Sequence, residues 1–214
     1  MKVYALRTPI SASLENIAAD KSISHRCAIF SLLSDKPSRV KNYLKAEDTL
    51  NTLEIVKNLG ARIEEKEGEL IITPSENLKE PSVVLECGNS GTAMRLFMGF
   101  LAASEGFFAL SGDEFLNRRP MARVAKPLIS VGAKIDGANG GDRAPLAIRG
   151  KKLEYFKFDS KIASAQVKSA LILAGLKSNG CELSEPELSR DHTERMLKGM
   201  GASLQILPHG VKVE

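Results

Sequence analysis

The sequence predicts an α+β fold in which a βαβαββ unit occurs three times, with three buried parallel helices at the centre of a pseudo-threefold arrangement. Three observations predict it. A Gly-Ala pair ends a helical stretch at Gly60, Gly132 and Gly201, so that the pairs lie 72 and 69 residues apart. Two short strands follow each pair. One helical stretch that is apolar on most sides and one amphipathic helical stretch precede it.

Each repeat carries a first helical stretch that is apolar on most sides. These stretches are 23–33, 93–103 and 165–176. A helix that is hydrophobic all round is buried, so these three are expected side by side in the core. A strand at 83–85 leads into the second of them, and a strand follows each one. The following strands are expected at 39–44, 107–110 and 181–183.

The second helix of each repeat is amphipathic, with apolar residues three and four positions apart. These helices are expected over 47–59, 120–131 and 193–200. The inward side chains are expected to be Leu50, Leu53, Val56 and Leu59 in the first, Met121, Val124, Leu128 and Val131 in the second, and Met196, Leu197 and Met200 in the third. Each helix ends at a glycine, which suits the left-handed cap position.

Two strands close each repeat and set the limits of the three units. The last strands are expected at 69–73, 145–149 and 210–213. The units therefore run over about 13–75, 76–150 and 151–214.

Composition limits the function. A net charge of +4 and an aromatic content of 5% are too low to argue for nucleic acid, whereas a mild positive balance suits a small anionic substrate. Cys27, Cys87 and Cys181 are far apart and make no ligand spacing with the three histidines, so neither a disulfide framework nor a metal site is expected. No signal peptide or membrane-spanning run is recognisable, so a cytoplasmic location without membrane contact is expected.

The start of the second buried helix has the composition of an anion-binding loop. Parallel helices start at the same end, where their unpaired N–H groups and dipoles sum to a positive patch. The stretch 86–95 (ECGNSGTAMR) places two glycines there, and glycine lets a ligand approach the backbone closely. Taken alone, this stretch is equally typical of a turn followed by a helix cap.

Cations, hydroxyls and amides stand at the other helix starts. They are Lys21, Ser22 and Arg26 at the first buried helix, Ser164 and Gln166 at the third, Arg119 before the second amphipathic helix, and Ser189 and Arg190 before the third. Arginine binds carboxylate or phosphate through two parallel bonds, and lysine acts as a point charge. The set therefore suits a small substrate with several negative charges.

These motifs resemble those of the 5-enolpyruvylshikimate-3-phosphate synthase family along essentially the whole chain. The matching segments are DKSxSxR at 20–26, GNSGTAMR at 88–95, RP at 119–120, SAQ at 164–166 and SR at 189–190. The resemblance implies an enzyme with two domains, each of three βαβαββ units, and substrates between them. It also implies transfer of the enolpyruvyl group from phosphoenolpyruvate to shikimate 3-phosphate by addition and elimination, without metal or organic cofactor.

The resemblance assigns one set of residues to phosphoenolpyruvate. Lys21 would contact this substrate and take part in charge and proton handling, which makes it the catalytic residue of this chain. Asn89 and the backbone of Gly91 would line the phosphoenolpyruvate site, where the herbicide glyphosate competes. Arg119 would bind the phosphate of phosphoenolpyruvate.

A second set is assigned to shikimate 3-phosphate. Ser22 and Arg26 would hold its hydroxyls and carboxylate, and Gln166 would bridge the two substrates. The residues around the 3-phosphate would be Ser164, Ala165, Ser189 and Arg190. Many members of the family have serine where this chain has Ala165, so one hydroxyl contact is lost there and only a backbone N–H remains.

The resemblance also predicts a missing partner domain, since the family's chains are roughly twice as long as this one. We expect residues 13–214 to form the N-terminal substrate-binding domain and residues 1–12 to resemble a strand of the absent second domain. The chain is expected to fold without turning over, because catalysis needs both walls of the cleft. Residues 1 to about 12 are expected to be loosely held or to pair with another copy.

Two alternatives remain open at this point. UDP-N-acetylglucosamine enolpyruvyl transferase shares the fold, but it has Lys-Asn in place of Lys21-Ser22 and a reactive cysteine in a loop that Cys87 does not match. A buried structural thiol is expected for Cys87. The other alternative is a non-catalytic anion-binding domain. His25 is expected to be a surface or satisfied histidine, and His192 lies near enough to the third site segment to contact substrate.

Overall fold

The structure is a computed structural model that describes residues 2, 11, 13 and 17–214. Its helices are α1 (Lys21–Ser31), α2 (Glu47–Asn58), α3 (Gly91–Ala102), α4 (Glu114–Asn117), α5 (Ala122–Ser130), α6 (Ala138–Gly141), α7 (Ala165–Leu176) and α8 (His192–Gly199). Its strands are β1 (Ser38–Val40), β2 (Arg62–Lys66), β3 (Glu69–Thr73), β4 (Leu85–Glu86), β5 (Gly106–Ser111), β6 (Lys134–Gly137), β7 (Arg143–Gly150), β8 (Phe156–Asp159), β9 (Cys181–Ser184), β10 (Leu204–Leu207) and β11 (Gly210–Val213).

The described strands form three sheets with the same connectivity. Their orders are β1-β3-β2, β4-β5-β7-β6 and β8-β9-β11-β10. In each sheet an antiparallel hairpin pairs through its second strand with the strand that follows the buried helix. In the second and third sheets another strand, β4 or β8, adds in parallel. This repeated topology confirms the predicted α+β fold.

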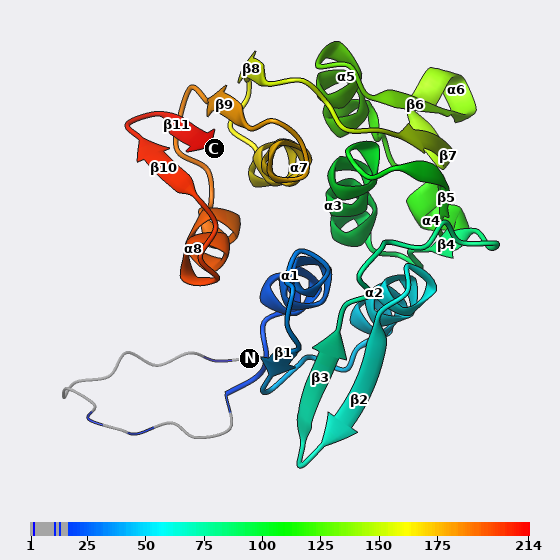
Figure 1. Ribbon diagram of the computed structural model, residues 1–214, viewed down its shortest axis with the longest axis vertical. Helices are drawn as coiled ribbons and strands as arrows, with labels where there is room; N and C mark the ends of the chain where they lie inside the picture. The colour runs from blue at the N-terminus through cyan, green and yellow to red at the C-terminus, as the bar shows by residue number, and fades with distance from the viewer. Residues whose placement is uncertain (1, 3–10, 12, 14–16) are drawn as a thin grey trace.

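The three helices α1, α3 and α7 occupy the centre of the molecule. Figure 1 shows them close to end-on, with the three sheets arranged around them. Gln166, near the start of α7, hydrogen-bonds Thr92 and Arg95 in the first turns of α3. Further along both helices, Gly99 lies so close to Ala170 that a Cβ on Gly99 would be 2.1 Å from its carbonyl oxygen. Residues early in α3 contact residues early in α7, and later residues of α3 contact later residues of α7, so the two helices are parallel.

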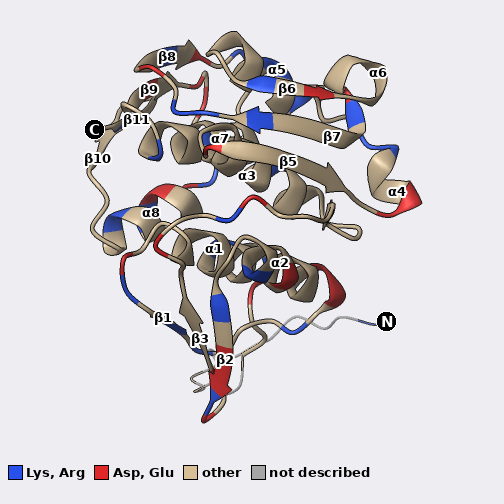
Figure 2. Ribbon diagram, turned by 45° about the vertical axis from the view of Figure 1, so that its right-hand side comes forward, with Lys and Arg blue, Asp and Glu red and all other residues tan. Residues whose placement is uncertain are grey.

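Helix α1 joins the pair with its own amino-terminal half. His25 lies within hydrogen-bond distance of Ser90, the cap residue of α3, and Arg26 bonds Ser169 on α7. The central helices carry little charge, and Figure 2 shows α3 and α7 largely tan while Lys, Arg, Asp and Glu mark outer strands such as β2 and β6. The three helices therefore form the buried centre that their composition predicts.

The Gly-Ala pairs have the predicted role. Gly60, Gly132 and Gly201 have φ of 108°, 100° and 91°, the left-handed region that glycine enters without a steric penalty. In each case the N–H of the following alanine bonds back into the helix, at Val56, Leu128 and Leu197. These bonds satisfy carbonyls that the helix end would otherwise leave open.

Two predicted burials and the start of one predicted strand are wrong. Leu50 on α2 is 47% exposed, because this helix turns Thr49 and Thr52 inward, where their hydroxyls bond backbone carbonyls. Met200, the cap residue of α8, is 48% exposed. Val83 and Val84 are also exposed, because β4 pairs with β5 only from Leu85 onwards.

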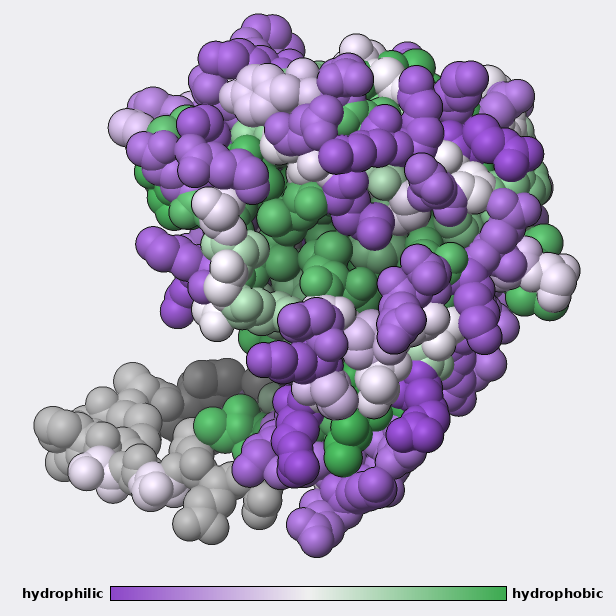
Figure 3. Space-filling view, viewed as in Figure 1, coloured by the Kyte–Doolittle hydropathy of each residue, from purple (hydrophilic) through white to green (hydrophobic). Residues whose placement is uncertain are grey.

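The carboxyl ends of the central helices lie at the opposite end of the molecule from their starts. A cavity of about 310 Å³ lies there, lined by Leu33, Leu176, Leu197 and Met200 among others. Figure 3 shows apolar side chains in a hollow in the middle of this face. Among the described residues, no helix is long and apolar enough to cross a membrane. The predicted strand at 1–12 falls in a segment of which only positions 2 and 11 are described.

Candidate anion-binding site

The amino end of α3 is built as a cradle of backbone and short side chains. Ser90 caps the helix by accepting the Ala93 N–H at 3.2 Å, and its own N–H bonds the Cys87 carbonyl at 3.0 Å. Gly88 has a φ of 55°, and a Cβ there would collide with Asn51. Glycine is therefore required for this turn, which leaves the first N–H groups of α3 facing the same end as Asn89 and Gly91.

Two arginines close this cradle. Arg119 donates to the side-chain oxygen of Asn89 and to its carbonyl, the latter at 3.4 Å. The Asn89 amide in turn donates to Asp113 at 2.7 Å, which fixes its orientation. Arg95 lies one turn inside α3, contacts the Gly91 carbonyl and donates to the Pro120 carbonyl at 3.0 Å. The structure thus brings the predicted residues Asn89, Gly91 and Arg119 together.

Gln166 joins the same cluster from α7. Its Oε1 accepts a hydrogen bond from Arg95 at 3.1 Å, and its Nε2 donates to Thr92 at 3.3 Å. The side chain therefore spans from the third repeat to the start of the second repeat's helix. Ser164 and Ala165 precede it, and Ser164 is the cap residue of α7 without a side-chain cap bond.

The start of α1 contributes two cations that differ in burial. Lys21 is about half exposed and pairs with Asp48 on α2. Arg26 is buried, with 5% exposure, and donates to Thr193 at 2.8 Å and to the Ser22 carbonyl at 3.1 Å. Ser22 and Arg26 thus share one face of α1, as their spacing predicts. Burial lowers the pKa of Arg26, and the neighbouring Glu194 opposes this effect.

A buried ionic cluster holds the segment before α8. The Lys168 ammonium lies 2.7 Å from both Glu185 and Glu194 and 3.3 Å from the Ser189 carbonyl. Glu185 accepts the Ser189 N–H at 3.0 Å and its hydroxyl at 2.6 Å. Burial opposes the charge on Lys168, but the two carboxylates outweigh it and raise its pKa. The backbone of Ser189 is therefore held at its N–H by Glu185 and at its carbonyl by Lys168.

Arg190 follows this anchored serine and is exposed. It lines a cavity of about 420 Å³ together with Lys168, Ser189 and Glu194. Ser164 lines a smaller neighbouring cavity that also includes Lys168. The predicted residues of the third repeat therefore gather around one lysine. No hydrogen bond joins Arg190 or Ser164 to the α3 cradle within the described residues.

Three arginines of this region lie outside the ion pairs of the described residues. Within the part of the chain that the structure describes, none of the ion pairs contains Arg26, Arg95 or Arg119. Burial, with Arg123 and Arg119 nearby, lowers the pKa of Arg95, and its buried Nε has no hydrogen-bond partner. Guanidinium groups that stand outside ion pairs beside a helix start are suited to bind an anion.

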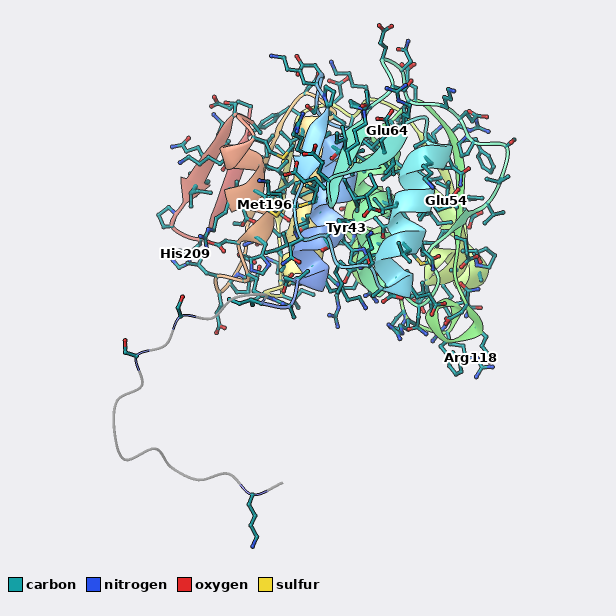
Figure 4. All side chains as sticks on the ribbon, turned by 90° about the horizontal axis from the view of Figure 1, so that it is seen from below. Tyr43, Glu54, Glu64, Arg118, Met196 and His209 are labelled. Atoms are coloured by element: carbon teal, nitrogen blue, oxygen red, sulfur yellow. The ribbon has the colours of Figure 1, made fainter. Side chains whose placement is uncertain are left out.

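Arg118 differs from its neighbour Arg119. It pairs with Glu114 at 3.0 Å and is largely exposed. Figure 4 shows it projecting outward from the lower edge of the molecule, the edge at which the chain enters α1. Only the second arginine of the pair therefore belongs to the cradle.

Sequence reasoning missed Arg95 and Lys168 as parts of the site. Both stand inside apolar helices. Arg95 bonds Gln166 of the third repeat, and Lys168 pairs with Glu185 and Glu194 on later elements of its own repeat, so no local pattern marks either residue. The interpretation of Cys87 as a structural thiol is confirmed, because it is fully buried and burial raises its pKa. His25 is a satisfied, buried histidine. His192 lines a cavity between α1 and α8 with Ile23, Arg195 and Met196.

Comparisons with known proteins agree with these motifs. A family model described as EPSP synthase (3-phosphoshikimate 1-carboxyvinyltransferase) matches residues 5–214. The chain is similar to the 3-phosphoshikimate 1-carboxyvinyltransferase of Campylobacter curvus, with 72% identity over all of this chain and 50% of the relative. The enzyme of the same name from Campylobacter jejuni serotype O:2 is 56% identical over the same shares.

A solved structure shows the same arrangement. The EPSP synthase from Acinetobacter baumannii, at 2.37 Å, superposes with a TM-score of 0.85 and 40% identity, covering 91% of this chain and 45% of that one. The chain therefore spans about half the length of the relatives that it matches.

Proposed function

The chain belongs to the EPSP synthase family, and from this membership we propose that it forms one wall of a site where the enolpyruvyl group passes from phosphoenolpyruvate to shikimate 3-phosphate. The observation that carries the proposal is a group of three arginines outside the ion pairs of the described residues, Arg26, Arg95 and Arg119, beside the amino ends of three parallel helices. Both substrates carry a phosphate and a carboxylate, which such a surface attracts.

Phosphoenolpyruvate occupies the cradle at the start of α3 in this proposal. Arg119 binds its phosphate, Asn89 and the Gly91 backbone line the site, and Lys21 approaches from α1. Support comes from the contacts between Arg119 and Asn89, which already place a guanidinium beside the loop. Lys21 is half exposed and pairs only with Asp48 among the described residues, so its ammonium is free to turn toward a ligand.

Shikimate 3-phosphate lies between α1, α7 and α8. Its phosphate meets Ser164, the Ala165 N–H, Ser189 and Arg190, while Ser22 and Arg26 hold the ring substituents. Gln166 bridges the two substrates. The anchored Ser189 supports this placement, as do the hydrogen bonds of Arg26 on α1 to Ser169 on α7 and Thr193 on α8.

The reaction is an addition followed by an elimination. A hydroxyl oxygen of shikimate 3-phosphate loses its proton and bonds to C2 of phosphoenolpyruvate, while C3 takes up a proton. The tetrahedral adduct then loses phosphate as the C2–O bond to phosphate breaks and C3 returns a proton. Lys21 stabilises the negative charge and handles one of these protons. No metal or organic cofactor takes part in this scheme.

A second half of the enzyme completes the site. The relatives extend over as much length again, and we propose that this further part forms the opposite wall. Closure of two walls excludes water and strengthens the electrostatic interactions within. The 214-residue chain alone is therefore expected to bind shikimate 3-phosphate without turnover. Measurable enolpyruvyl transfer by this chain would contradict that expectation.

Calorimetry on variants of three arginines tests the proposal. Arg119→Met is expected to weaken phosphoenolpyruvate binding about tenfold, and Arg190→Met to weaken shikimate 3-phosphate binding similarly, since each loses a charge-assisted contact. Arg118→Met, which removes an outward-facing arginine, is the matched control and leaves both affinities unchanged. No heat at millimolar ligand, or equal effects in all three variants, would overturn the proposal.

Competition with glyphosate tests the assignment of the α3 cradle to phosphoenolpyruvate. Glyphosate is expected to displace phosphoenolpyruvate but not shikimate 3-phosphate, because it occupies the α3 cradle. A UDP-sugar that binds more tightly than shikimate 3-phosphate would favour the related UDP-N-acetylglucosamine enolpyruvyl transferase instead.

We place the enzyme in the cytoplasm, where both phosphorylated substrates are metabolites, and fluorescence of a tagged full-length enzyme checks this.

A further inference from the structure

His25 links the two parts of the proposed phosphoenolpyruvate site without belonging to it. It is fully buried on α1, between the start of α3 and the first turns of α2. Its Nδ1 lies 2.7 Å from the Thr52 hydroxyl, and its Nε2 lies 3.1 Å from the Ser90 hydroxyl. Ser90 caps α3 between Asn89 and Gly91, whereas Thr52 follows Asp48, the partner of Lys21, by one turn of α2.

The direction of each hydrogen bond follows from the partners. The Thr52 hydroxyl lies 3.1 Å from the Asp48 carbonyl, which can only accept, so the single Thr52 proton points there. Thr52 must then accept from Nδ1–H of His25. A neutral imidazole has one N–H, so Nε2 accepts the Ser90 hydroxyl proton. Ser90 itself accepts the Ala93 N–H at 3.2 Å.

The charges around His25 favour the same neutral form. Lys21 and Arg26 on α1 disfavour a second proton, and only Asp48 on α2 favours it. On α3 the facing groups are the uncharged Ser90 hydroxyl and the positive end of the helix, which suits a nitrogen lone pair. Burial is the largest cause, and with these charges it lowers the pKa of His25 to about 4.

We propose that His25 is a positioning residue for anion binding: held as the Nδ1–H tautomer, its Nε2 lone pair fixes the Ser90 hydroxyl and thereby the loop Gly88–Gly91. The Ser90 rotamer determines both the α3 cap and the path of the loop. Loss of the Nε2 acceptor frees the hydroxyl and loosens the N–H groups that face the anion. This inference rests on the proposed function, because it concerns the same cradle.

Two amide variants separate the two ring nitrogens. The Oε1 of glutamine reaches the position of Nε2, so His25→Gln keeps the acceptor for Ser90. The Nδ2 of asparagine reaches the position of Nδ1, so His25→Asn keeps the donor for Thr52 and leaves Ser90 without an acceptor. At pH 7.5, phosphoenolpyruvate binding is expected to weaken about tenfold in His25→Asn and less than threefold in His25→Gln.

A merely structural histidine would act through stability, because asparagine is one methylene smaller than glutamine and leaves more space at this buried position. Urea unfolding of both variants is therefore the control. Equal losses of affinity in the two variants, a larger loss in His25→Gln, or a loss in His25→Asn that urea unfolding shows to follow a general loss of stability, would overturn the proposal. Nitrogen-15 spectra of the histidine-labelled chain add a direct readout, with the ring proton expected on Nδ1. A proton on Nε2 would also overturn it.

The amide signals of the loop test the proposal without any ligand. In His25→Asn the shifts of residues 88–93 are expected to change and the Ala93 N–H to exchange faster, while His25→Gln resembles the unsubstituted chain. If phosphoenolpyruvate fails to bind the unsubstituted chain, the proposed function fails, and these amide shifts still decide the role of His25. Equal loop changes in both variants would then contradict it.

Discussion

Lys168 balances two carboxylates in the interior, and its removal is expected to be costly. Its ammonium and the carboxylates of Glu185 and Glu194 are all less than 10% exposed. Lys168→Met would leave two buried negative charges without a partner, and breaking such a cluster typically costs about 3–5 kcal/mol. Urea unfolding is expected to show a loss of this size.

The matched control is Lys161→Met, which removes an exposed lysine that pairs with Asp159. Such surface pairs contribute little, so a change below about 0.5 kcal/mol is expected. A loss in Lys168→Met no larger than in this control would show that the buried cluster does not hold the segment around Ser189.

His25 makes stability depend on pH in a defined window. Its ordinary pKa of 6.5 falls to about 4 in the folded chain, chiefly through burial and then through Lys21. Between these values the unfolded chain takes up a proton that the folded chain does not, so stability falls as pH falls. From pH 7 to pH 5 the expected loss is about 2 kcal/mol.

Urea unfolding at both pH values measures this loss, and His25→Gln serves as the comparison. The variant lacks the titrating ring, so its loss between pH 7 and pH 5 is expected to be smaller by about 2 kcal/mol. The same pH dependence in both chains would assign the effect to other groups.

At the scale of elements, the contact between α3 and α7 depends on a missing side chain. A Cβ on Gly99 would lie 2.1 Å from the Ala170 carbonyl oxygen, so Gly99→Ala must push the two helices apart. Overpacking of this kind typically costs about 1–3 kcal/mol. Thermal unfolding is expected to show a lower midpoint.

Gly199→Ala is the matched control on α8. A Cβ at Gly199 would meet no atom within 4 Å, and its φ is outside the left-handed region. Alanine is expected to stabilise by about 0.5–1 kcal/mol there, since it restricts the unfolded chain. A higher midpoint for Gly99→Ala than for Gly199→Ala would refute the close contact.

The principal helices could be predicted from the sequence, but some orientations could not. The apolar stretches locate α1, α3 and α7 within two residues of the structure, and the glycine caps locate the ends of α2, α5 and α8. The rotation of α2 could not be predicted, because Thr49 and Thr52 are buried through hydrogen bonds that a polar pattern does not reveal. The short helices α4 and α6 have too few residues for any periodic pattern.

The residues of the candidate site likewise divide into those that could be predicted from the sequence and those that could not. Residues in motifs at helix starts, such as Asn89 and Arg119, could be selected from the sequence because glycine and arginine there have a direct chemical meaning. Arg95 and His25 act through partners in other repeats, and Lys168 acts through carboxylates on later elements of its own repeat. These contacts exist only after the elements are packed, so they required the structure.

For the whole molecule, the parallel packing of three helices concentrates positive potential at one end. Arg26, Arg95 and Arg119 lie at that end, while the carboxyl ends surround an apolar cavity lined by Leu33 and Leu176. A doubly charged ligand is therefore expected at one end and not at the other. The two ends of the molecule therefore differ in chemistry, although the three repeats are alike.

The most direct measurement of this account is the mapping of amide chemical shifts as shikimate 3-phosphate is added to the labelled chain. The account predicts changes that cluster at the starts of α1, α3 and α7 and at Ser189-Arg190, with little change around Leu33 and Leu176. Shifts scattered over the surface, or confined to the carboxyl ends of the helices, would contradict it.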